Sequence, residues 1–177
     1  MRTWIALIRG INVGGNNVLP MKELRALLEN LGFENARTYI QSGNCIFQSD
    51  RDDTSSFSEE IAGAIMAKLD FKPSVLILNE SDLRLAIEKN PYPQGLEDPK
   101  SVHLFFLSEA ASEPNIEALD QLRKASEDYE ITNKVFYLYT PEGIGRSKLA
   151  SQAEKKLGFT TTARNLRSAI KILELAS

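Results

Sequence analysis

Trp4-Ile5-Ala6-Leu7-Ile8-Arg9-Gly10-Ile11-Asn12-Val13-Gly14-Gly15-Asn16-Asn17 is the stretch that decides the fold. Its first five residues are apolar at both parities, which is typical of a strand buried on both faces. The Gly- and Asn-rich part predicts a loop, because these residues tolerate positive φ. Pro20 suits the first turn of a helix, and leucines recur at helical spacing between residues 24 and 31. The fold therefore opens with a strand, a demanding loop and a helix.

The elements after this helix predict a four-stranded α+β unit. Ser42-Gly43-Asn44 indicates a hairpin turn between two short strands. Ser56 and Glu59 have the spacing of a capping box, which predicts the start of a second helix. A strand at 73–78 closes the unit. The resulting order, β-α-β-β-α-β, is the ferredoxin-like arrangement.

The second half of the chain repeats this order incompletely. We expect a helix at 81–89, a turn-rich link at 90–95, a strand at 102–107, a helix around 116–122, a hairpin around 132–134, and final helices at 147–157 and 163–175. The fold class is therefore α+β, with two ferredoxin-like subdomains packed together and antiparallel sheets. We place them at 1–79 and 80–177, with the boundary between 78 and 101.

Composition favours a globular protein of the cytoplasm. The 177 residues are 42% hydrophobic and 25% charged, and the formal net charge is −3. This balance gives no general attraction to nucleic acid or to anionic membranes, so we expect neither partner. The longest early apolar run has five residues, too few for a membrane span. Composition does not predict the oligomeric state.

The scarcity of cysteine and histidine limits the chemistry. Cys45 is the single cysteine and His103 the single histidine, so a Cys/His zinc site is excluded and no metal or cofactor is expected. One cysteine also fits a reducing compartment. We expect His103 to pack within a strand and Cys45 to be an inert core thiol. Asp50-Arg51-Asp52-Asp53 reads as a solvated turn rather than a calcium loop.

The topology predicts that two polar loops meet at one end of the first sheet. In a sheet of order 4-1-3-2, the first and third strands are antiparallel neighbours. The end of the first strand therefore lies beside the hairpin that joins the second and third strands. Residues 9–17 would therefore lie beside residues 41–44. Loop amides together with Arg9 could hold an oxyanion. The glycine spacing matches neither the P-loop nor the dinucleotide motif, and a purely conformational turn is the alternative.

Two later segments place cations beside expected helix starts. Gly143–Lys148 leads into one helix with Ser147 as its N-cap, and Thr161–Asn165 leads into the last helix with a threonine cap. The alternative is that both segments are ordinary capped helix starts without a binding role. The full set of candidate ligand-binding residues is Arg9, Gly10, Asn12, Gly14, Gly15, Asn16, Gln41, Ser42, Gly43, Asn44, Arg146, Ser147, Lys148, Arg164 and Asn165.

These segments together resemble a known family. The motifs that carry the resemblance are Ala6-Leu7-Ile8-Arg9-Gly10-Ile11-Asn12-Val13-Gly14-Gly15, Leu19-Pro20-Met21, Tyr39-Ile40-Gln41-Ser42-Gly43-Asn44, Gly145-Arg146-Ser147-Lys148-Leu149 and Thr162-Ala163-Arg164-Asn165. The combination resembles the bacterial domain-of-unknown-function family 1697. The resemblance implies an α+β protein of two small subdomains without an established activity. The family commonly continues with Trp-Asn-Thr, where this chain has Leu166-Arg167-Ser168.

Three functions follow as hypotheses. The first is binding of a small anionic, phosphate-bearing ligand at residues 9–17 and 41–44. The second is an interaction module in which the loops only shape the fold. The third is a hydrolase or transferase that uses Ser42 or Ser147, for which no general base is readable from the sequence.

Overall fold

The computed structural model describes residues 1–110 and 113–177, which form two compact units. Unit 1 comprises Met1–Arg84 and Lys171–Ser177, and unit 2 comprises Leu85–Ile170. The helices α3 (Glu80–Glu88) and α6 (Leu166–Ala176) each begin in one unit and end in the other. The contacts therefore assign the last seven residues to unit 1, whereas the predicted units of 1–79 and 80–177 are each continuous in sequence.

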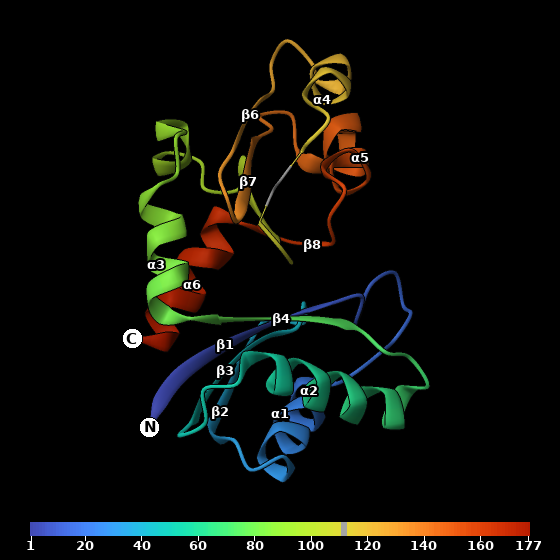
Figure 1. Cartoon of the computed structure of the whole chain (residues 1–177), viewed down its shortest axis with the longest axis vertical. Helices are drawn as coiled ribbons and strands as arrows, with labels where there is room; N and C mark the ends of the chain where they lie inside the picture. The colour runs from blue at the N-terminus through green and yellow to red at the C-terminus, as the bar shows by residue number, and fades with distance from the viewer. Residues whose placement is uncertain (111–112) are drawn as a thin grey trace. The chain divides into compact units, whose positions relative to one another are not determined.

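Unit 1 is a β-α-β-β-α-β unit with a single antiparallel sheet. Its elements are β1 (Arg2–Arg9), α1 (Met21–Asn30), β2 (Glu34–Tyr39), β3 (Asn44–Ser49), α2 (Thr54–Leu69) and β4 (Ser74–Asn79). The strand order is β2-β3-β1-β4, as the first half of the sequence predicts. Figure 1 shows α1 and α2 on one face of this sheet.

The core of unit 1 lies between the sheet and its helices. Trp4, Ala6 and Ile8 of β1 pack with apolar residues of α1, β3 and α2. The alternate residues Ile5 and Leu7 are also buried, so β1 is buried on both faces, as its sequence predicts. Cys45 is a fully buried residue of β3, which confirms its expected place in the core.

Unit 2 has the same topology. Its elements are the 3₁₀ turn η1 (Pro93–Leu96), β5 (Val102–Leu107), α4 (Ile116–Leu122), β6 (Asp128–Ile131), β7 (Val135–Tyr139), the 3₁₀ turn η2 (Ile144–Arg146), α5 (Lys148–Leu157) and β8 (Thr161–Asn165). The sheet order is β6-β7-β5-β8, the exact counterpart of unit 1. Figure 1 shows α4 and α5 on one face of this second sheet. The α+β class with two similar halves is therefore confirmed.

Two local expectations are wrong. Thr161–Asn165 is not a capped helix start: it is strand β8, paired antiparallel with β5, and α6 begins only at Leu166. The strand forms because the edge of the buried strand β5 needs a hydrogen-bonding partner. The N-cap of α2 is Asp53 rather than Ser56, since the Asp53 carboxylate accepts a hydrogen bond from the Ser56 amide.

His103 is a packed strand residue, as expected. It is 7% exposed in β5, and its Nδ1 lies 3.4 Å from the Thr140 hydroxyl. Burial lowers the pKa of His103 from 6.5 to about 4, because the charged ring would lose its hydration. The imidazole is therefore neutral at neutral pH.

This neutral, buried histidine makes stability depend on pH. The pKa of His103 is lower in the folded chain than in the unfolded chain. The stabilisation that the neutral His103 side chain gives the folded state is therefore complete above pH 6.5, and it is lost as the pH falls toward about 4. We expect a loss of about 3 kcal/mol in the free energy of unfolding from this residue. Urea titrations at several pH values should show His103→Gln to be less pH-sensitive than wild type. Parallel profiles for the two proteins would contradict the assignment.

Candidate functional site

The Gly-rich loop of unit 1 ends in a small, tight hairpin. Gly14 and Gly15 have φ of 57° and 80°, and the Asn16 amide donates to the Val13 carbonyl at 2.9 Å. Positive φ at both central residues defines a type I′ turn, which explains the pair of glycines. The turn is exposed. The amides of Gly14 and Gly15 meet no acceptor among the residues that the structure describes.

Asn12 ties this loop to the second hairpin. Its Nδ2 donates to the carbonyls of Leu19 and Gln41, both at 2.9 Å, and its Oδ1 accepts from the Leu19 amide at 2.7 Å. Residues 9–17 and 41–44 therefore do meet, as the topology predicts, and we call them the loop pair. The Asn12 side chain serves this junction, so the structure gives it a bridging role that the sequence did not reveal.

The contact between β1 and the 41–44 hairpin requires glycine. The Ile8 amide donates to the Gly43 carbonyl at 2.8 Å, and Gly43 has φ of 76°. A Cβ at this position would lie 2.9 Å from both the Cβ and the carbonyl oxygen of Ile8. Gly10, with φ of 85°, likewise lies close to the Phe71 ring. These two glycines allow close backbone packing and are not freely substitutable.

Asparagine side chains hold both loops from within. Asn17 Nδ2 donates to the Gly10 carbonyl at 2.9 Å. The buried Asn44 donates through Nδ2 to the Tyr39 carbonyl at 3.0 Å and to the Ser42 hydroxyl at 2.9 Å. The loop pair is therefore fixed before any ligand arrives. Its exposed candidate groups are Arg9, Gly14, Gly15, Asn16, Gln41 and Ser42.

Three exposed apolar residues are next in sequence to the residues of this junction. Val13, Val18 and Ile40 are 63%, 58% and 51% exposed, and each is next in sequence to a residue of the Asn12 hydrogen bonds. Ile40 also has φ of 50°, which is unfavourable for a β-branched residue. The loop pair and the residues directly next to it thus carry both polar backbone groups and exposed apolar side chains.

The remaining candidates lie in unit 2 and have roles there. Ser147 is buried and caps α5, because its hydroxyl accepts from the Ala150 amide at 2.9 Å. Asn165 accepts from the Ser168 amide at the start of α6, and Arg164 donates to the Ala163 carbonyl at 2.8 Å. Arg146 and Lys148 are exposed beside the cap. Ser147 is confirmed as an N-cap, and this use of its buried hydroxyl disfavours a nucleophilic role.

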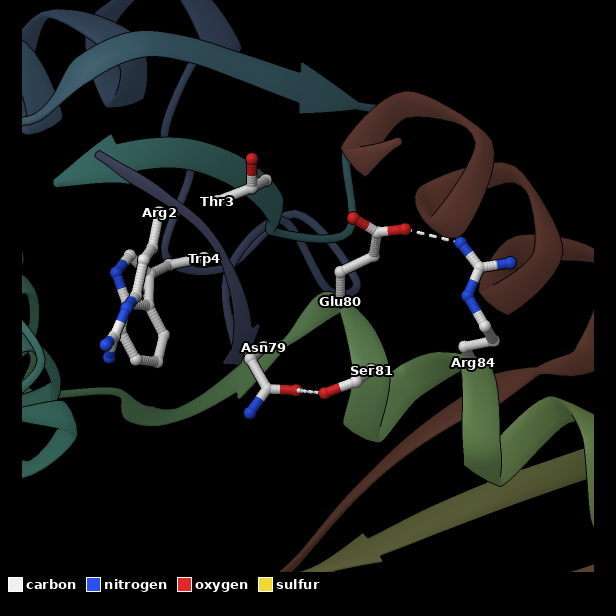
Figure 2. Close-up of a pocket in the computed structure, with 7 residues that line it drawn as sticks. All are labelled: Arg2, Thr3, Trp4, Asn79, Glu80, Ser81 and Arg84. Atoms are coloured by element: carbon white, nitrogen blue, oxygen red, sulfur yellow. Dashed lines mark hydrogen bonds and ion pairs between the residues drawn. The ribbon is translucent and has the colours of Figure 1, made fainter.

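An open pocket of about 540 Å³ lies at the other end of β1. Its walls are Arg2, Thr3, Trp4, Asn79, Glu80, Ser81 and Arg84, none of which the sequence singled out for a site. Figure 2 shows that four of its polar side chains form two pairs: the Ser81 hydroxyl donates to Asn79, and Arg84 pairs with Glu80. Arg2 pairs with Asp52 outside the pocket, and among the described residues the buried Trp4 Nε1 has no hydrogen-bond partner. We place the candidate site at the loop pair, where the two predicted loops meet.

The comparisons with known proteins support the fold. The family model described as "protein of unknown function (DUF1697)" matches residues 1–137. A conserved bacterial protein from Streptococcus pneumoniae has a similar structure, with a TM-score of 0.69 and 24% sequence identity over 99% of each chain. A search of curated proteins found no match. Within the residues that the structure describes, no helix has the length and apolar character to cross a bilayer.

We expect Gly43→Ala to destabilise the protein by about 2 kcal/mol or more, because a Cβ would combine an unfavourable φ with a backbone clash. Gly63→Ala is the matched control: Gly63 lies within α2 and its Cβ would meet nothing within 4 Å. That change should stabilise by about 0.5–1 kcal/mol. Chemical denaturation measures both. Equal effects of the two substitutions would refute the proposed packing constraint.

Removing the Asn12 side chain should open the loop pair. Asn12→Gly keeps the positive φ accessible and isolates the lost hydrogen bonds, which we expect to cost about 1–3 kcal/mol. Hydrogen exchange should show faster exchange of the Leu19 amide, which donates to Asn12 Oδ1. Asn16→Gly, in the exposed turn, serves as the control. An unchanged Leu19 amide in Asn12→Gly would show that Asn12 does not hold the loop.

Proposed function

We propose that this chain, which belongs to the DUF1697 family of proteins of unknown function, binds a small anionic, phosphate-bearing ligand at its loop pair. The observation that supports the proposal is the exposed turn at Gly14 and Gly15. Its two amides have no acceptor among the described residues, and backbone amides of this kind are common ligands of oxyanions. The family description itself names no activity.

Rigidity of the loop pair favours binding. Asn12, Asn17 and Asn44 fix the loops through side-chain hydrogen bonds to backbone carbonyls, so ordering them would cost little free energy when a ligand binds. This changes the expected role of two residues. Asn12 and Asn44 fix the conformation of the loops and do not contact the ligand in this proposal. The turn amides and the exposed groups nearby would contact the anion.

Arg9 supplies the charge in this proposal. It is the last residue of β1, it is exposed, and it directly precedes the loop. A guanidinium can bind a phosphate through two parallel hydrogen bonds, which adds orientation as well as attraction. Gln41 and Ser42 are exposed on the adjoining hairpin and could contact the rest of the ligand. The proposal does not require Arg146, Lys148 or Arg164, which belong to unit 2.

Amide chemical shifts recorded during titration with inorganic phosphate, a nucleoside monophosphate and a sugar phosphate test this function. We expect the Gly14 and Gly15 amides to move, and Arg9→Gln to weaken binding about tenfold. Arg2→Gln, which removes an exposed arginine at the opposite end of β1, is the matched control and should bind like wild type. Absence of binding, or equal affinities of wild type and Arg9→Gln, would exclude the proposal.

A protein-interaction role is the second candidate, and the exposed Val13, Val18 and Ile40 favour it. Exposed apolar side chains that gather at one place often mark a contact surface. Val13→Ser distinguishes the two functions, since this neutral change should leave phosphate binding through the turn amides intact but remove an apolar contact. Loss of self-association in light scattering without loss of phosphate binding would favour the interaction role.

A further inference from the structure

The pocket at the start of β1 lies where the pairing of β1 with β4 ends. The last pair of this ladder is Trp4 opposite Asn79, and α3 begins at the next residue, Glu80. Arg2 and Thr3 therefore extend beyond the end of β4, although both still pair with β3. The volume of about 540 Å³ is within the range of small-molecule sites. All residues that line the pocket belong to unit 1.

The indole of Trp4 carries a buried donor that lacks an acceptor. Trp4 is 5% exposed, and its Nε1 has no hydrogen-bond partner among the residues that the structure describes. A buried N–H without an acceptor is unfavourable, and buried tryptophans usually bond theirs. Because Trp4 also lines the pocket, a molecule bound there is in a position to supply the acceptor.

Asn79 adds a second unpaired donor on the same face of the sheet. Residues directly opposite each other in an antiparallel ladder project to one face, so the Asn79 side chain lies beside that of Trp4. The Asn79 Oδ1 accepts from the Ser81 hydroxyl and from the Asp82 amide, both at 2.7 Å. These bonds orient the amide group, and its Nδ2 has no acceptor among the described residues.

Arg2 brings positive charge to this face. Arg2 and Trp4 are two residues apart in β1, and Figure 2 shows both side chains on one side of the strand and Thr3 on the other. The Arg2 side chain is 67% exposed and pairs with Asp52 at 3.1 Å, and exposed pairs of this kind are weak. Since Trp4 Nε1 is closed to solvent, a ligand reaches it only when a neighbour moves. The long, exposed Arg2 side chain is suited to that movement.

We propose that this pocket is a second binding site, which takes a small molecule through a carboxylate group. A carboxylate has two acceptor oxygens and no donor, which matches the unpaired N–H of Trp4 and the unpaired NH₂ of Asn79. Arg2 would exchange Asp52 for the ligand and form a charge-assisted hydrogen bond with it. The site lies at the opposite end of β1 from the loop pair and does not depend on the function proposed there.

The charges around the pocket favour a single negative charge over a phosphate dianion. Asp52 already offsets the charge of Arg2, and Glu80 offsets that of Arg84. The two remaining donors, on Trp4 and Asn79, are neutral. A dianion would therefore meet little excess positive charge, whereas one carboxylate can satisfy both donors.

Trp4 reports on its own site, because it is the single tryptophan of the chain. The full chain is titrated with acetate, benzoate, inorganic phosphate and chloride at constant ionic strength, up to about 50 mM, a range that detects dissociation constants on the order of 1 mM. We expect the indole N–H signal to shift saturably with the two carboxylates only, while the Gly14 and Gly15 amides stay unchanged. No saturable shift with either carboxylate, or an equal shift with phosphate or chloride, would overturn the proposal.

Two substitutions identify the donors. Asn79→Asp keeps the oxygen that caps α3 but replaces the NH₂ donor by an anionic oxygen, so it should weaken carboxylate binding at least about tenfold. Asn115→Asp is the matched control, because the Asn115 Oδ1 caps α4 by accepting from the Ala118 amide. Arg2→Gln should weaken binding about tenfold, whereas Arg9→Gln, at the other end of β1, should not. Equal affinities of folded Asn79→Asp and Asn115→Asp proteins, or of Arg2→Gln and Arg9→Gln, would refute the site.

Discussion

Pairing of β1 on both of its edges is the constraint on which unit 1 depends. This strand bonds to β3 on one side and β4 on the other, and residues Trp4 to Ile8 are all buried. A strand so enclosed must find partners for every backbone group. That requirement brings the Ile8 amide to Gly43, which fixes where the second hairpin lies. The pairing of the central strand β1 therefore determines where the two loops lie, and the loop residues themselves do not.

The loop pair shows how one residue type can serve two purposes. Asparagine is frequent in ligand-binding loops, and it is equally suited to bridging backbone groups across a turn. In this protein the bridging use dominates, because Asn12, Asn17 and Asn44 all donate to backbone carbonyls. The surface left for recognition consists of backbone amides, Arg9 and a few apolar side chains. A ligand that binds there meets a surface whose shape already exists.

Sequence reasoning predicts the first unit well because hydrophobic period, turn residues and strand order agree there. It misses β8 because Thr161 and Thr162 suit both a strand and a helix cap, and only pairing with β5 decides between them. It places the α2 cap at Ser56 because Ser56 and Glu59 match a capping box, although Asp53 has an equally suitable side chain nearer the helix start. The role of Asn12 was not predictable, since its bridging hydrogen bond to Gln41 depends on the meeting of distant loops.

Two helices that span both units tie the halves of the chain together. A cut between Arg84 and Leu85 would leave α3 as a stub of five residues and another of four, and α6 would likewise be divided near Lys171. Helices of such length do not hold together in water without packing partners. The repeated topology suggests two modules that could be separated by truncation. Because α3 and α6 are each divided between the units, neither unit alone contains a complete copy of these helices. Evolutionary or engineered recombination of this fold would therefore have to exchange both units together.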